Sequence, residues 1–189
     1  MQQHVERVLI DREAIARRVG ELAREIAADF RRELPGDVPE ITLVPILTGS
    51  LIFVADLVRQ LPLMMRLRMV TVSSYPGQAT SSEGAKIEGR LPEDLSGQHV
   101  LVVDDILDSG NTIRLVRAEL LKRGAASVRS CMLLRKQIPS AMAEHADYVG
   151  FEIPDAFVVG YGLDYDGYYR NLADVVTLKA DILGEGEAT

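Results

Sequence analysis

The sequence predicts an α/β fold in which a mostly parallel β-sheet is flanked by helices. Strand-like apolar runs alternate with amphipathic, helix-like runs along most of the 189 residues, as in a parallel sheet covered by helices. The central run, 100–103, is apolar at every position and rich in β-branched residues, which is typical of a strand buried on both faces. This run ends in acidic residues, and open α/β sheets bind ligands at the carboxyl ends of their strands.

The first half of the chain is predicted to contain two helices and two strands. Asp11 is the expected N-cap of a helix whose apolar residues recur at helical spacing until it closes near residues 34–36. A strand over 41–47 precedes a helix over 49–61. Residues 68–74 alternate in polarity, which indicates another strand.

The second half begins with the central strand, a turn and a helix, together spanning 100–124. Strands are predicted over 128–134 and 148–153, with a short helix between them, and a last strand-like piece covers 157–161. The Gly- and Glu-rich tail, 184–189, is expected to be disordered.

Composition limits the class of protein. The sequence 1–189 shows no linker or internal repeat, and a single domain of this length buries about 70% of its unfolded surface. The net charge of −7 argues against binding to nucleic acid or to a membrane surface, because both need a basic surface. No apolar stretch approaches the ~20 residues that span a bilayer. The single Cys131 and the lack of an export signal lead us to expect a cytoplasmic protein.

The residues that suggest chemistry cluster at the end of the central strand. Asp104, Asp105 and Asp108 follow one another closely there, although like charges at a buried strand end repel. Roles in a turn or a helix cap would explain Asp108 or Ser109 alone, but not three carboxylates. The turn 109–112 offers small residues, hydroxyls and backbone N–H groups at a helix start, which suits an anion. We therefore predict a phosphate-binding turn beside carboxylates that suit hydroxyls, a metal or a proton.

The segment 102–112, Val-Val-Asp-Asp-Ile-Leu-Asp-Ser-Gly-Asn-Thr, resembles the phosphoribosyl-pyrophosphate (PRPP) signature of type I phosphoribosyltransferases. With Asp at position 108 it is most similar to the hypoxanthine-guanine branch. The resemblance runs from residue 43 to about residue 172 and rests on four motifs. It implies the type I phosphoribosyltransferase fold, with a core of about 36–150 under a small hood built by the N-terminal helix and residues 151–183. It also implies Mg²⁺-dependent transfer of phosphoribose from PRPP to hypoxanthine or guanine.

By this resemblance, Asp108 faces N7 of the purine and acts as the catalytic general base. Asp104 and Asp105 would bind the ribose hydroxyls of PRPP, directly or through hydrated magnesium. The 5-phosphate of PRPP would lie on the backbone and hydroxyls of the turn formed by Asp108, Ser109, Gly110, Asn111 and Thr112.

Two further motifs would complete the site. Lys136, at the end of the strand 128–134, matches the family lysine that donates to the purine 6-oxygen. Phe157 would stack on the purine and the backbone of Val158 would read its edge, while Asp164 would hold a second magnesium and Arg170 would pair with pyrophosphate. From spacing alone, Lys136 would be a solvated lysine, Phe157 a core residue and Arg170 a surface residue.

The fourth motif is the pair Ser74 and Tyr75, which in this family opens a mobile lid that excludes water. The segment 75–95 is long, rich in Gly and Ser, and poor in large apolar residues, so it is either such a lid or a disordered connection.

The loop before the second helix departs from the family pattern. Relatives commonly read Leu-Lys-Gly there, often with a cis bond before the lysine, and use the loop to bind PRPP through its pyrophosphate. This chain has Thr48 before Gly49, so the backbone role can survive but the cation is missing. We expect weaker attraction of pyrophosphate, or compensation by Arg66, Arg68 or magnesium.

Two other functions compete with this interpretation. One is a transferase that prefers xanthine or accepts oxopurines broadly. The other is a PRPP-sensing regulator that binds nucleic acid, which the acidic composition and the intact Asp108 and Lys136 oppose. The expected partners are therefore PRPP, hypoxanthine and guanine, without nucleic acid or membrane. Relatives form dimers and tetramers, so a homo-oligomer is expected.

Overall fold

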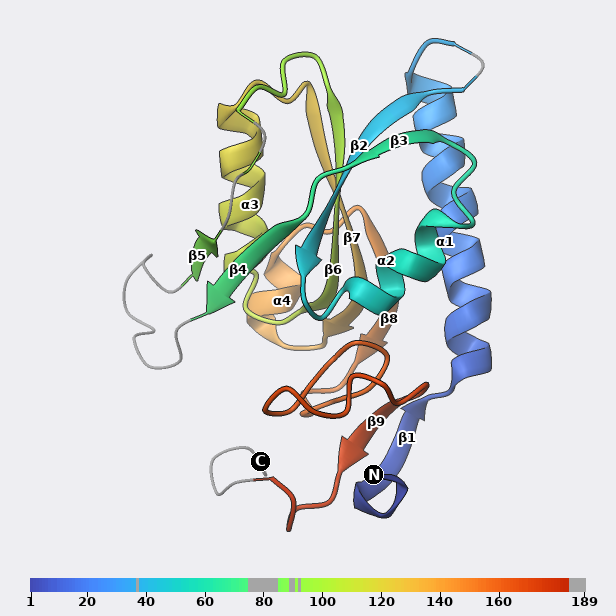
Figure 1. Cartoon of the computed structure of the whole chain (residues 1–189), viewed down its shortest axis with the longest axis vertical. Coiled ribbons are helices and arrows are strands. Elements are labelled where there is room, and N and C mark those ends of the chain that lie inside the picture. The colour runs from blue at the N-terminus through green and yellow to red at the C-terminus, as the bar shows by residue number, and fades with distance from the viewer. Residues whose placement is uncertain (37, 75–84, 89–90, 92, 184–189) are drawn as a thin grey trace.

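The computed structural model describes residues 1–36, 38–74, 85–88, 91 and 93–183. Within these residues the middle layer is a central sheet of seven strands with helices on both of its faces (Figure 1). The predicted α/β class is therefore confirmed. The strands are β2 (Glu40–Leu47), β3 (Met64–Leu67), β4 (Val70–Ser74), β5 (Ala85–Glu88), β6 (His99–Leu107), β7 (Ser127–Lys136) and β8 (Tyr148–Ile153).

The strand order places β6 in the interior of the sheet. The order is β5-β4-β2-β6-β7-β8, and β3 shares one edge of β2 with β4. Only the pair β4 and β5 is antiparallel among the described pairings of this sheet. Because β2, β6 and β7 run in parallel, the residues that follow Leu47, Leu107 and Lys136 emerge at one edge of the sheet.

Helices cover the two faces in pairs. α1 (Arg12–Glu33) and α2 (Leu51–Val58) lie on one face, and α3 (Asn111–Lys122) and α4 (Pro139–Ala143) lie on the other (Figure 1). Alternate side chains of β6 point to the two faces of the sheet. Leu101 packs in the hydrophobic core on the face covered by α1, whereas Val102 packs in the core on the face covered by α3. This burial on both faces explains why the strand is apolar throughout.

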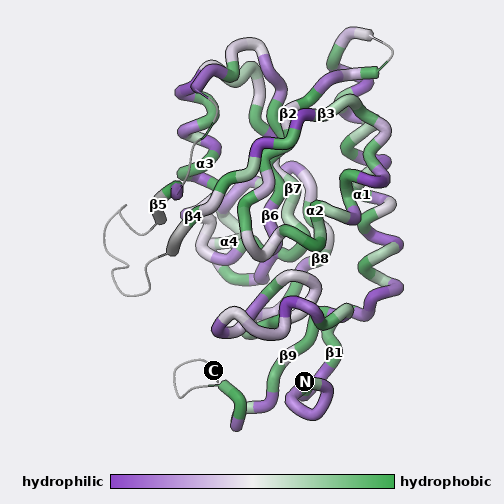
Figure 2. Tube along the Cα trace, viewed as in Figure 1, coloured by the Kyte–Doolittle hydropathy of each residue, from purple (hydrophilic) through white to green (hydrophobic). Residues whose placement is uncertain are grey.

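α1 begins where the sequence predicts. The Asp11 carboxylate accepts a hydrogen bond from the backbone N–H of Ala14 at 2.7 Å, as an N-cap does. Hydrophobic and hydrophilic residues alternate along the helix (Figure 2). Its apolar stripe, from Ile15 to Phe30, is buried against the sheet and α2.

The hood differs from the prediction. A short 3₁₀ turn (Gln2–His4) leads into β1 (Val5–Ile10), which pairs antiparallel with β9 (Val175–Leu178) in a separate two-stranded sheet below the core (Figure 1). The N-terminal helix was expected in the hood, but this is wrong. Its broad apolar stripe matches the large apolar face of the central sheet, and the hood receives only the preceding strand.

Other boundaries also change. Residues 157–161 do not form a strand, because Gly160 and Tyr161 have positive φ, and only isolated bridges form, at Val159 and Gly160. The predicted loop 75–95 contains β5 at its centre. Tyr75 and the tail 184–189 lie outside the described residues. None of the helices in the described part of the chain has the length and apolar character to cross a membrane.

Candidate active site

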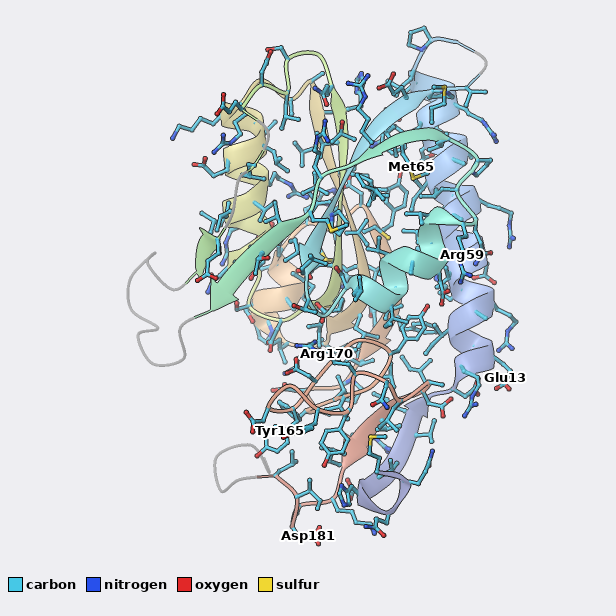
Figure 3. All side chains as sticks on the ribbon, viewed as in Figure 1. Glu13, Arg59, Met65, Tyr165, Arg170 and Asp181 are labelled. Atoms are coloured by element: carbon cyan, nitrogen blue, oxygen red, sulfur yellow. The ribbon has the colours of Figure 1, made fainter. Side chains whose placement is uncertain are left out.

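A cleft of about 480 Å³ opens at the carboxyl ends of the parallel strands. Its walls come from the β2–α2 loop, the end of β6 with the turn into α3, and the hood. Arg170 lies between the sheet and the hood (Figure 3). The polar residues of the lining are Thr48, Asp104, Asp105, Asp108, Ser109, Thr112, Asp164 and Arg170.

The two aspartates at the end of β6 are buried like-charged neighbours. Asp104 is 7% exposed and accepts the Asp105 N–H at 3.0 Å, while Asp105 accepts the Ile106 N–H at 3.0 Å. Burial raises the pKa of both carboxyls; the charge of Asp105 adds to the rise at Asp104, and Arg170 opposes the rise at Asp105. Hydroxyl donors or a cation would stabilise the ionised forms, which is what a ribose or magnesium supplies.

The β2–α2 loop packs directly on these carboxylates. A Cβ atom at Gly49 would lie 1.7 Å from Oδ2 of Asp105, so only glycine fits there. The peptide bond between Leu47 and Thr48 is cis. The exposed Thr48 lines the cleft in place of the family lysine.

The expected compensation for that lysine by surface arginines is not found. Arg66 pairs with Glu40 at 2.8 Å, at the amino end of β2, because β3 is in register with that end. Neither Arg66 nor Arg68 lines the cleft. Among the described residues, Arg170 is the one cationic side chain in the lining, against four aspartates.

The turn predicted to bind phosphate lies between β6 and α3, at the cleft. Gly110 has φ +76° as the N-cap of α3, and a Cβ there would lie 3.1 Å from Glu144. Ser109, Gly110 and Thr112 line the cleft. The side chain of Asn111 does not, because its Oδ1 accepts a hydrogen bond from Arg114 at 2.6 Å. The role predicted for Asn111 uses its backbone, so its contact with PRPP stays a prediction.

Asp108 and Lys136 come together across the sheet edge. The register of β6 with β7 puts Leu107 beside Arg135, and Nζ of Lys136 lies 3.1 Å from Oδ2 of Asp108 and 3.0 Å from Oδ1 of Asp155. Burial lowers the pKa of Lys136, but the hydrogen bonds that its ammonium donates to Asp155 and Asp108 outweigh burial and raise the pKa. The lysine is therefore a cation at neutral pH, with a carboxylate beside it that is 51% exposed.

The two predicted purine contacts of the hood lie outside the cleft lining. Phe157 is half-buried and packs edge-on against Tyr165, with ring centroids 5.6 Å apart. The side chain of Val158 is buried in the core. Neither residue lines the 480 Å³ cleft, so their contacts with a purine remain predictions.

Asp164 and Arg170 form one unit on the hood. Nη2 of Arg170 lies 2.7 Å from Oδ1 of Asp164, and its Nη1 donates to the carbonyl of Gly162 at 2.6 Å. Across the described residues no three His, Cys, Asp or Glu side chains are grouped closely enough to hold a metal. The predicted metal ligands Asp104, Asp105 and Asp164 thus do not form a preformed cage.

Two residues of the site were missed in the sequence. Asp155 pairs with Lys136, and Gly162 supplies the carbonyl that holds Arg170. Gly162 has φ +106°, and its place in a Gly-Tyr-Gly run was the available signal. Asp155 follows a proline after a strand and carried no signal of its own.

Comparisons with known proteins agree with this geometry. Residues 9–166 match the family model of the phosphoribosyl transferase domain. The chain is 44% identical to the hypoxanthine-guanine phosphoribosyltransferase of Mycobacterium avium, over 92% of this chain and 86% of the relative. It is 41% identical to the enzyme of the same name from Aquifex aeolicus, over 92% and 94% of the two chains.

Solved structures give the same result. A Trypanosoma cruzi hypoxanthine phosphoribosyl transferase, studied for the role of its C-terminal region in oligomeric state and activity, has a TM-score of 0.87 and 36% identity. That alignment covers 95% of this chain and 94% of the other. A variant of the Trypanosoma cruzi enzyme complexed with the product IMP has a TM-score of 0.84 and 36% identity, and it covers 95% and 93%.

Proposed function

We propose that this chain, which belongs to the phosphoribosyltransferase family, is a hypoxanthine/guanine phosphoribosyltransferase of purine salvage. It transfers the 5-phosphoribosyl group of PRPP to hypoxanthine or guanine, and it releases IMP or GMP and pyrophosphate. The observation that carries this proposal is the Asp108–Lys136 pair, 3.1 Å apart, beside the phosphate turn. A carboxylate and a cation at this spacing suit a ring N–H and a neighbouring 6-oxygen.

PRPP occupies the 480 Å³ cleft in this proposal. The backbone N–H groups at the start of α3, with the hydroxyls of Ser109 and Thr112, hold the 5-phosphate. Asp104 and Asp105 accept hydrogen bonds from the ribose hydroxyls. Arg170 binds the pyrophosphate with the planar, multi-donor geometry of a guanidinium.

Asp108 accepts the proton from N7 of the purine. At the same time N9 of the purine attacks C1 of the ribose and pyrophosphate leaves. Deprotonation moves negative charge toward the 6-oxygen, where the Lys136 ammonium donates a hydrogen bond. Because Lys136 also contacts Asp155, it keeps a carboxylate partner when the purine occupies Asp108. General-base catalysis of this kind contributes typically 10²–10⁴-fold.

Magnesium fits the donor set of the cleft. Four aspartates and one arginine line it among the described residues, whereas PRPP is strongly anionic, so a bound cation is needed to offset the repulsion. Mg²⁺ is usually held by one or two carboxylates together with substrate phosphates, which requires no preformed cage. We assign Asp104, Asp105 and Asp164 as the residues that would hold it when substrate is bound, where it would supply positive charge beside the leaving pyrophosphate.

The remaining contacts belong to the same proposal. Phe157 stacks on the purine, and the backbone of Val158 reads its edge. Ser74 and Tyr75 begin a lid over the cleft; β4, which ends at Ser74, contributes Val72 to the lining.

We also propose that the enzyme is a cytosolic homo-oligomer, a dimer or tetramer. Large apolar side chains are exposed around α2 and β3, which favours self-association. The free thiol of Cys131 is buried, in keeping with a reducing compartment. Sedimentation analysis at micromolar concentration checks the assembly. The exposed residues are Leu51, Ile52, Met64, Leu67 and Met69.

The decisive assay measures pyrophosphate release from PRPP with hypoxanthine, guanine, xanthine and adenine, each with and without Mg²⁺. We expect the 6-oxopurines hypoxanthine and guanine to react, xanthine to be poor, adenine to be rejected, and chelation of Mg²⁺ to stop the reaction. No release with any purine would overturn the proposal, and salt-dependent binding of DNA or RNA would then favour the regulator. Preference for xanthine would assign the chain to that substrate instead.

A further inference from the structure

The hood turn beside the cleft has an unusual backbone. Gly160, Tyr161 and Gly162 have φ values of +96°, +50° and +106° in succession. Glycine adopts such angles without steric cost, but a residue with a side chain does so rarely, and the surrounding structure must hold it there. The side chain of Tyr161 therefore supplies contacts that a glycine at this position would lack.

The Tyr161 side chain ties this turn to α2. Tyr161 is 7% exposed, and its hydroxyl donates a hydrogen bond to Oδ2 of Asp56 at 2.7 Å. Burial raises the pKa of Tyr161, and the Asp56 carboxylate raises it further, so the hydroxyl remains protonated and a donor. Asp56 also pairs with the exposed Arg59 on the same helix.

Next to Tyr161, the turn rests on the loop that departs from the family pattern. A Cβ atom at Gly162 would lie 2.1 Å from the carbonyl oxygen of Gly49. Gly49 in turn packs so closely on the Asp105 carboxylate that a Cβ atom at Gly49 would overlap it. The turn is thus in direct backbone contact with the loop that contains Thr48, on the side where the cleft holds pyrophosphate.

The same turn fixes Arg170. Its guanidinium donates to the Gly162 carbonyl at 2.6 Å and pairs with Asp164. A second cavity, of about 270 Å³, is lined by Arg170 together with Tyr161 and Asp56. Because a cavity lies on that side of Arg170, its guanidinium is positioned by the hydrogen bond to Gly162 and the ion pair with Asp164. The backbone N–H of Gly162 also donates to the carbonyl of Arg170 at 3.0 Å, so the turn that Tyr161 anchors contributes to the position of Arg170.

We infer that Asp56 and Tyr161 are positioning residues for the pyrophosphate half of the PRPP site: their hydrogen bond holds the turn that fixes Arg170 and supports the Thr48–Gly49 loop. This inference rests on the proposed function. Since Thr48 brings no cation, the placement of the single arginine of the described lining matters more here than where a lysine shares its role.

The test compares steady-state constants for PRPP and for guanine. Tyr161→Phe keeps the ring but loses the donor, and Asp56→Ala loses the acceptor. We expect each to raise the KM for PRPP about fivefold to thirtyfold, the effect of losing one buried hydrogen bond, while the KM for guanine changes less than about twofold. Asp56→Asn keeps an acceptor oxygen and should restore most of the affinity for PRPP. Arg59→Gln removes the ion pair with Asp56 and the hydrogen bond to the Ala55 carbonyl but leaves the bond between Tyr161 and Asp56. It is the matched control and should keep the KM for PRPP within about twofold.

The outcomes separate the inference from the function on which it rests. An inactive wild-type protein overturns the proposed function. An active wild type whose KM for PRPP is unchanged in Tyr161→Phe and Asp56→Ala overturns the inference alone, as does an equal rise in the two KM values. If Tyr161→Phe does not fold, Asp56→Ala and Asp56→Asn decide, because the Asp56 side chain is partly exposed on α2 and does not pack in the core. An effect of Arg59→Gln as large as that of Asp56→Ala would assign the role to the ion pair.

Discussion

At the residue scale, the ion pair of Asp108 and Lys136 suits the purine contact that we propose for it. The lysine is 15% exposed and has two carboxylate partners, whereas Asp108 is half-exposed and faces the cleft. A purine can therefore take over the Asp108 contact while Asp155 keeps the buried ammonium paired. This arrangement avoids the cost of an unpaired buried charge at the moment of binding.

We predict that Asp108→Asn lowers kcat with guanine by about 10²–10⁴-fold, because the amide cannot accept the N7 proton. The KM for PRPP should stay within a few-fold, since the side chain is not a main PRPP ligand in this assignment. Pyrophosphate release at neutral pH measures both constants. Asp155→Asn is the comparison, since it removes a carboxylate from Lys136 without removing the base, and its kcat should fall far less. A kcat near that of the wild type in Asp108→Asn would exclude this residue as the base.

Lys136 is predicted to set the purine selectivity. It has three donors and no acceptor, so it complements a 6-oxygen and opposes the amino group of adenine. Wild-type kcat/KM should favour guanine over adenine at least tenfold and as much as about a thousandfold. Lys136→Met should narrow this ratio at least about tenfold. The ratio is measured with guanine and adenine at saturating PRPP. An unchanged ratio in Lys136→Met would show that Lys136 does not set the purine selectivity.

Asp104 is predicted to lower the stability of the ligand-free protein. Its pKa is raised in the folded state by burial and by the charge of Asp105, so stability falls as pH rises from 3.8 through the raised pKa. Asp104→Asn should therefore have a higher Tm than the wild type at pH 7.5, and this difference should disappear toward pH 4. Its KM for PRPP should rise about tenfold or more, because hydrogen bonds to a charged acceptor are lost. A lower Tm of Asp104→Asn than of the wild type at pH 7.5 would contradict the prediction that the ionised Asp104 carboxylate destabilises the folded protein.

At the scale of single elements, a helix or strand could be predicted from the sequence when the pattern that specifies it lies within its own residues. α1 carries its own cap and a long apolar stripe, and β8 is bounded by polar residues, so both were predicted within a few residues. β1, β5 and β9 have four to six residues and lie at sheet edges. They exist because of a partner strand, which no local pattern reports.

The N-cap of α1 gives a prediction at this scale. Asp11→Ala should lower the free energy of unfolding by about 1 kcal/mol, since it leaves the N–H of Ala14 without its acceptor. Chemical denaturation measures the change. Arg17→Ala, an exposed substitution inside the same helix, should change stability by less than about 0.5 kcal/mol and serves as control. Equal stability of both variants would mean that the cap contributes nothing.

At the scale of the whole molecule, sequence reasoning found the residues at the ends of β6 and β7, because parallel strands bring their carboxyl ends together. It could not find how the hood meets the core. The contact of Gly162 with Gly49 and the pairing of Lys136 with Asp155 depend on how turns close in three dimensions. The direction of the Asn111 side chain depends likewise on Arg114, one turn along α3.

The pairing of β1 with β9 has a consequence for synthesis in the cell. Val5 meets Leu178 and Ile10 meets Val175, so among the described strands the first to leave the ribosome pairs with the last. At translation rates of about 5–20 residues per second, β1 waits roughly 10–30 s for its partner, while the central sheet can already assemble. During this interval its unpaired backbone can pair with strands of other nascent chains. Among the described elements the hood is therefore the last to assemble, and Arg170 reaches the cleft only after the central sheet has been synthesised.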